Sequence, residues 1–161
     1  MKRIIAILLA AMMVFALAAC GTTSNTNETE AVTTTAPAAT TVGTKLLADF
    51  KADTNGTAQE IADRLLTNEV IQFMPASMPV EPGFLTGFDN IEVKGFEEGV
   101  MFGPAIGTIP FVGYIFTLAE GEDADAFMQT LKDNANLRWN ICTEAEELIV
   151  ESEGNKVFFV M

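Results

Sequence analysis

FVGYIFTL, residues 111–118, is a run of aromatic, β-branched and other apolar residues that contains no charge. Residues of these types are enriched in strands. Because successive side chains of a strand point to opposite faces, a run without polar alternation must be buried on both sides. The stretch therefore predicts a central strand in a sheet that is covered on both faces.

The wider segment 100–119 has no charged residue and is long enough to be considered as a transmembrane helix. Pro104 and Pro110 would break such a helix. Acidic residues flank the segment, whereas basic residues mark a cytoplasmic side. We therefore predict a loop over residues 103–110 that leads into the buried strand.

The end of the chain is predicted to form a β-hairpin. Residues 148–152 and 156–161 are apolar stretches, and Glu153-Gly154-Asn155 separates them. Gly-Asn is a favoured two-residue turn between antiparallel strands.

Two segments show helical periodicity. In residues 122–135, apolar positions recur at helical spacing and acidic residues occupy the first turn, where they suit the positive end of a helix. A calcium loop over residues 120–125 is the alternative, but the ligand spacing and distal Glu of an EF-hand are missing. The second helix is predicted to begin at the capping box Thr57-Ala58-Gln59-Glu60 and to end near residue 67.

The segments between these elements are less regular. Three prolines in residues 74–83 predict an irregular connection, and residues 84–96 predict a strand with its approach. Apolar and polar residues alternate over 137–142, which predicts a half-buried strand with Trp139 in the core. The alternative for Trp139 is a ligand site that uses its ring beside Arg138.

Together these elements predict one α+β domain over residues 45–161. Two helices would pack on a mainly antiparallel sheet of about four to five strands, with the hairpin at the C-terminus. Residues 21–44 precede this domain, are rich in Thr and contain no Phe, Leu, Ile, Trp or Tyr. Such a segment is predicted to be a flexible tether with an r.m.s. reach on the order of 25 to 30 Å, and its threonines could carry glycans.

The N-terminus has the layout of a secretory signal, with two basic residues followed by the apolar stretch 4–16. Leu17-Ala18-Ala19-Cys20 then resembles the lipobox of bacterial lipoprotein precursors. The resemblance implies that residues 1–19 are removed and that the Cys20 thiol takes a diacylglyceryl group, so that acyl chains such as palmitate hold the protein on membrane lipid. The alternative is an ordinary secretory peptide in which this cysteine occurs by chance.

The general layout also resembles small lipoproteins of Gram-positive bacteria. This resemblance implies a lipid-anchored protein on the extracytoplasmic face of the cell membrane. In a Gram-negative cell envelope, Gly21 after the cysteine would be compatible with sorting to the outer membrane. The residues leave the two locations open.

The chain from Cys20 onward has 7 basic against 22 acidic residues, a formal charge of −15. Nucleic acid is therefore excluded as an expected partner. An acidic surface also repels anionic lipid headgroups, so we expect the domain to stand off the membrane.

Residues suited to catalysis are few. The absence of histidine excludes Ser-His and Cys-His nucleophile pairs and His-ligated metals. Ser24, Ser77 and Ser152 have no base at an activating spacing. Cys142 has no expected disulfide partner and is predicted to be a small buried residue, with a reactive thiol as the alternative. No cofactor and no metal are expected.

These observations favour a non-catalytic binding or accessory module that acts on an envelope protein or a small ligand. Two alternatives remain at this point. One is a small extracytoplasmic hydrolase that uses acidic residues, and the other is a purely structural envelope protein.

Overall fold

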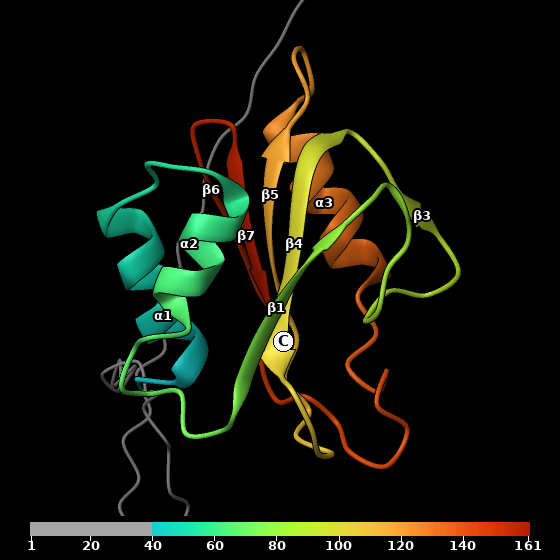
Figure 1. The fold of residues 1–161 in the computed structure, drawn as a ribbon. Helices are drawn as coiled ribbons and strands as arrows, with labels where there is room; N and C mark the ends of the chain where they lie inside the picture. The colour runs from blue at the N-terminus through green and yellow to red at the C-terminus, as the bar shows by residue number, and fades with distance from the viewer. Residues whose placement is uncertain (1–39) are drawn as a thin grey trace, which may run out of the picture. The chain divides into compact units, whose positions relative to one another are not determined.

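The computed structural model describes residues 40–161, so the predicted signal, Cys20 and most of the predicted tether lie outside the described residues. The described part is built on a five-stranded antiparallel sheet in the order β1-β4-β5-β7-β6 (Figure 1). The strands of this sheet are β1 (Pro75–Val80), β4 (Phe96–Pro104), β5 (Gly113–Leu118), β6 (Ile149–Glu153) and β7 (Lys156–Val160). A small second sheet pairs β2 (Gly83–Phe84) with β3 (Glu92–Val93), and the helices are α1 (Val42–Ala52), α2 (Ala58–Leu65) and α3 (Ala124–Asn134).

The predicted central strand is confirmed. β5 lies between β4 and β7, and all six of its residues are buried. The strand begins at Gly113, and Phe111 and Val112 belong to the preceding loop. Between Thr40 and Met161 no helix has the length and apolarity that a membrane crossing requires.

Helices cover both faces of the sheet, as Figure 1 shows, with α1 and α2 on one side and α3 on the other. On the first face, Leu46 and Phe50 of α1 and Ile61 of α2 pack in one apolar cluster with Ile115 of β5 and Phe158 of β7. Side chains at alternate strand positions point the other way, so each strand contributes to two cores.

The second core lies between the sheet and α3. Phe127 of α3 meets Phe116 of β5 edge to face, with ring centroids 5.3 Å apart. Tyr114 stacks on Phe116, and Phe159 of β7 meets Tyr114 edge to face. These aromatic contacts fix α3 against the strands at the centre of the sheet.

The structure contains three helices in the described part, so the prediction of two was wrong in number. The two predicted helices are present as α2 and α3, and Asp123 caps α3 by accepting a hydrogen bond from the Ala126 amide at 2.9 Å. The missed helix is α1, which begins at Val42 within the segment predicted as tether. Thr41 and Thr44 form its capping box, a signal that the Thr-rich composition of the segment concealed.

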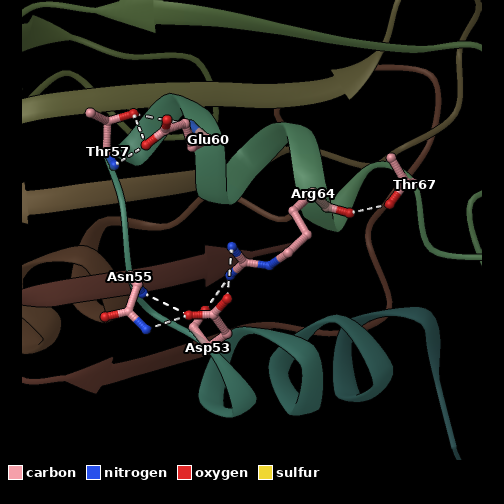
Figure 2. A network of polar contacts seen from close by, with 6 residues as sticks. All are labelled: Asp53, Asn55, Thr57, Glu60, Arg64 and Thr67. Atoms are coloured by element: carbon pink, nitrogen blue, oxygen red, sulfur yellow. Dashed lines mark hydrogen bonds and ion pairs between the residues drawn. The ribbon is translucent and has the colours of Figure 1, made fainter.

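A polar network joins the end of α1 to α2 (Figure 2). Arg64 of α2 lies 3.5 Å from the Asp53 carboxylate and donates to its backbone carbonyl, and Asp53 also accepts from the Asn55 amide at 2.9 Å. Thr57 and Glu60 form the predicted capping box at the start of α2. Because Arg64 and Asp53 are both partly exposed, this network orients the connection and adds little stability.

Two connecting segments differ from the predictions. Residues 75–80, predicted to be irregular because of their prolines, form the edge strand β1, where a residue without an amide hydrogen is tolerated. Residues 84–96, predicted to be a strand with its approach, contain the end of β2, a loop, β3 and the first residue of β4.

The predicted strand at residues 137–142 is absent, and a turn takes its place. The Asn136 side chain accepts from the Arg138 amide at 2.9 Å, which favours a turn over an extended chain. Ile141 has a φ of 54° and is 84 % exposed. Cys142 is exposed, so the prediction that it is buried was also wrong.

The predicted C-terminal hairpin is confirmed in part. β6 and β7 pair antiparallel, with Glu153 opposite Lys156 across the Gly154-Asn155 turn. The strand bounds are shifted relative to the prediction, because Glu153 belongs to β6 and β7 ends at Val160.

The ring of Phe102, which is opposite Gly113 on β4, leaves no space for a side chain at residue 113. A Cβ atom at this position would lie 2.2 Å from the ring of Phe102, which is fully buried on β4. We expect Gly113→Ala to lower the free energy of unfolding by about 1–3 kcal/mol, since the ring must move within a packed core. Denaturant titration measures the change, and the penalty should shrink in a Phe102→Leu background. Equal penalties in both backgrounds would contradict the contact as the cause.

Candidate functional site

A cavity of about 310 Å³ lies at the end of the sheet where β4 leads into the loop 105–112. Strands β1 and β4 form one wall, and the loop and the turn around Trp139 form the others. The side chains that give the cavity its apolar character are Met78, Met101, Phe102, Ile109, Phe111, Val112 and Trp139.

None of the residues that line this cavity is charged. Its polar lining residues are Thr86 and Asn140, besides the backbone of the loop. An apolar lining with a few polar groups is typical of sites for small molecules.

The edge strand β1 supplies alternate residues to the cavity. Ala76 and Met78 line it, whereas Ser77 between them contacts Gln59 and Asp63 on the opposite face of the sheet. Met78 pairs with Met101 of β4 in register. Methionine side chains are unbranched and adapt to irregular shapes, so this wall can adjust to a bound molecule.

Backbone hydrogen bonds hold the loop 105–112 at both ends. The Ala105 amide donates to the Met74 carbonyl at 2.8 Å, and Val112 exchanges two hydrogen bonds with Met161 at 3.0 and 2.9 Å. In the middle of the loop, the Thr143 hydroxyl donates to the Thr108 carbonyl at 3.3 Å. The cavity wall is therefore tied to β1, to the C-terminus and to the turn that carries Trp139.

The indole N–H of Trp139 is the most informative polar group at the site. The Nε1 atom is buried, and no residue among those described accepts a hydrogen bond from it. Because buried N–H groups are nearly always paired, this unpaired donor beside the cavity requires an explanation.

Tyr114 holds the part of the cavity wall that Thr86 forms. Its hydroxyl donates to the Thr86 carbonyl at 2.7 Å, and Thr86 lines the cavity. Burial raises the pKa of Tyr114 above its usual range, so the hydroxyl stays protonated and remains a donor.

The two ligand-site candidates from the sequence occupy different surroundings. Trp139 lines the cavity and packs beside the core between the sheet and α3. Arg138 is not among the lining residues, and its guanidinium lies 3.3 Å from Glu144 on the surface, with 69 % of the side chain exposed. Met78 and Met101 could not be found from the sequence, because isolated methionines in strands have no characteristic spacing.

A second cleft, of about 350 Å³, contains Glu81, Glu97 and Glu98 and bears on the hydrolase alternative. Glu98 accepts hydrogen bonds from the Ala58 amide at 3.1 Å and from the Thr117 hydroxyl at 3.0 Å. The hydrogen bond from the Ala58 amide is the largest effect on the pKa of Glu98, and it lowers this pKa. The Thr117 hydroxyl and Lys156 lower it as well, whereas partial burial raises it, so the pKa stays below its ordinary value. Glu98 thus ties the start of α2 to the sheet, which is a structural role.

Ser77 is the serine that the fold places beside an acidic group. It donates to the Asp63 carboxylate at 2.6 Å and accepts from the Gln59 amide at 2.7 Å. A serine nucleophile needs a base that removes its proton and is itself oriented by a third group. The two hydrogen bonds of Ser77 connect β1 to α2.

Within residues 40–161 no group of three or more Cys, Asp or Glu side chains could hold a metal ion.

Comparison with known proteins gives no match to a protein-family model, to a curated protein or to a solved structure.

The lowered pKa of Glu98 implies that the stability of the protein depends on pH. A carboxyl whose pKa is lowered on folding stabilises the protein above its unfolded pKa, and this contribution is lost as the pH falls through the folded pKa. We expect Glu98→Gln to reduce the loss of stability between neutral pH and about pH 3 by roughly 0.5–1 kcal/mol, because the partly exposed group is screened by solvent.

Thermal unfolding at both pH values measures this effect, and Glu97→Gln at the neighbouring exposed position is the matched control. An identical acid response in wild type and Glu98→Gln would contradict the assigned role of Glu98.

Proposed function

We propose that this protein is a lipid-anchored, extracytoplasmic binding module whose cavity beside Trp139 takes a small neutral ligand. The ligand would have an apolar body and a hydrogen-bond acceptor. The observation that carries the proposal is the buried indole N–H of Trp139, which lacks an acceptor among the described residues, on a residue that lines an uncharged cavity.

The size and lining of the cavity define the class of ligand. A volume of about 310 Å³ is at the lower end of the range for small-molecule sites, about 300–1,000 Å³. A charged ligand would lose its hydration without gaining an opposite charge from the lining. A neutral molecule with apolar groups against Met78 and Met101 avoids this cost.

The indole then gives the site a preference among neutral ligands. An unpaired buried donor costs about 1–3 kcal/mol, and a ligand carbonyl or ether oxygen that accepts from Nε1 removes this cost. A hydrocarbon of the same shape leaves the donor unpaired. The proposed site therefore distinguishes molecules that differ only in one oxygen atom.

The anchoring part of the proposal is supported by the sequence. The basic start, the apolar stretch and the segment Leu17-Ala18-Ala19-Cys20 occur in the order found in lipoprotein precursors. Two acyl chains on Cys20 would hold the protein stably on membrane lipid. A non-catalytic role is supported by the lack of histidine and by the structural use of Glu98.

Matched pairs of fragments test the binding site. We expect neutral fragments with a carbonyl group to bind more tightly, by about tenfold, than isosteric fragments without it, since one buried hydrogen bond is worth about 1.4 kcal/mol here. The fluorescence of Trp139, the single tryptophan, reports binding.

Ala76→Leu, which fills the cavity from β1, should abolish binding. Ala126→Leu on the exposed side of α3 is the matched control and should bind as wild type does. Equal affinity of wild type and Ala76→Leu would place the binding elsewhere and contradict the proposal.

A separate measurement tests the anchor. We expect the protein extracted from cell membranes to start at Cys20 and to carry the mass of its acyl chains, and Cys20→Ser to appear in the soluble fraction. Intact-mass spectrometry decides between the outcomes, because an unmodified mature chain in the wild type would contradict anchoring.

A further inference from the structure

Exposed hydrophobic residues are concentrated at one end of the described domain. Seven large hydrophobic residues are exposed in residues 40–161, and all except Phe84 lie around the loop between β4 and β5. We call this surface the apolar end, and it consists of Val42, Met74, Met78, Ile106, Ile109 and Ile141. The most exposed members are Ile106 and Ile141, at 73 % and 84 %.

Contacts between separate segments join these residues into one surface. The Ala105 amide bonds to the Met74 carbonyl, and the Thr143 hydroxyl bonds to the Thr108 carbonyl, which brings the Ile141 turn beside the loop. Ile109 lines the same open hollow as Val42. An exposed apolar surface built from several segments marks an interaction site.

The loop at the centre of the apolar end carries no charge, although charged residues surround it. Residues 103–119 are uncharged, whereas the chain as a whole has a formal charge of −13. Lys45 and Glu69 both line the hollow beside Val42. Glu147 accepts a hydrogen bond from the Thr41 hydroxyl at 2.9 Å, and Arg138 is paired with Glu144. Apolar contact through the uncharged loop must therefore outweigh the repulsion between these carboxylates and anionic lipid.

The N-terminal segment joins the domain at the apolar end. Thr40 and Thr41, which precede α1, line the hollow that Ile109 also lines. In Figure 1 the start of α1, the loop after β4 and the loop before β6 lie at the lower end. The chain that leads from Cys20 therefore enters the domain where the exposed isoleucines lie.

We propose that the apolar end docks on the surface of the lipid bilayer that holds Cys20, with Ile106 and Ile141 inserted among the lipids. This inference rests on the proposed lipid anchor. It revises the expectation that the acidic domain stands off the membrane, because that expectation considered only charge and not the exposed apolar residues at this end.

Because the proposed lipid anchor already holds the protein at the membrane, a weak contact is enough to keep the domain docked. Without the residues that belong to α1, the predicted tether covers residues 21–41 and would have an r.m.s. reach on the order of 25 Å. A binding surface that is tethered over such a distance meets its partner at an effective concentration in the millimolar range. A few isoleucine side chains can then keep the domain on the membrane, although the same chains would not bind a free domain tightly.

Cys142 offers a probe at the right place. It is exposed, it follows Ile141, and it is the only thiol that remains free when Cys20 is acylated. A compact nitroxide on Cys142 of the full lipidated protein reports its surroundings by its accessibility to oxygen, which partitions into lipid, and to a water-soluble nickel complex.

We expect the ratio of oxygen to nickel accessibility to rise several-fold when the labelled protein is reconstituted in vesicles of phosphatidylcholine with a minority of phosphatidylglycerol. The labelled Cys20→Ser protein in solution gives the aqueous reference. A label on Glu120→Cys in a Cys142→Ser background is the spatial control, because Glu120 follows the opposite end of β5 and should stay aqueous.

The variant Ile106→Ser/Ile141→Ser should remain on the vesicles while its Cys142 label returns to the aqueous value. Both side chains are highly exposed, so we expect the variant to fold, and circular dichroism checks that it does. This variant also shows whether the label inserts by itself, since insertion without the two isoleucines would overturn the proposal.

The remaining outcomes separate the anchor from the docking. Vesicle-bound wild type with an aqueous Cys142 label overturns docking and leaves the anchor intact. Wild type without acyl chains and without vesicle retention overturns both. A label that is aqueous in vesicles but shielded in native membranes identifies a protein as the occupant and overturns docking on lipid.

Discussion

The burial of β5 on both faces is the constraint on which the rest of the structure depends. A strand without a solvent-facing side needs neighbours on both edges and covers on both faces. β4 and β7 supply the edges, the α1–α2 pair covers the face of Ile115, and α3 covers the face of Phe116. At one end of the strand even a methyl group at Gly113 would meet the ring of Phe102. The chain therefore has little freedom in how it packs around this strand.

The covers are incomplete at the end of the sheet where β5 begins. α3 packs against Phe116 through its own Phe127. Beyond α3 the sheet is closed by the loop 105–112 and the Trp139 turn. A cavity and a set of exposed apolar residues remain at this end. Elsewhere in the described part, large apolar side chains are mostly buried. The proposed ligand site and the proposed membrane contact share Met78 and Ile109, so a bound domain would hold its cavity at the lipid surface.

The elements with strong local signals could be predicted from the sequence. The uncharged run of β5, the Thr57 capping box, the acidic residues at the start of α3 and the Gly-Asn turn each act within a few residues, and each led to the correct type of element. α1 was missed because its capping box lies in a segment whose composition resembles a disordered chain. The Trp139 segment was predicted to be a strand from its alternating apolar residues. That pattern does not include the effect of the Asn136 side chain, which stabilises a turn. The cavity depends on long-range pairing, which no local pattern encodes.

We propose the Trp139 indole N–H as the donor that a ligand engages. A ¹H–¹⁵N spectrum reports on this contact, because the chain has one tryptophan and hence one indole signal. When a carbonyl-bearing fragment binds, we expect a saturable downfield shift of the indole proton and no change at the Gly154 amide on the far hairpin turn. An indole signal that stays fixed while the fragment binds would rule out this hydrogen bond.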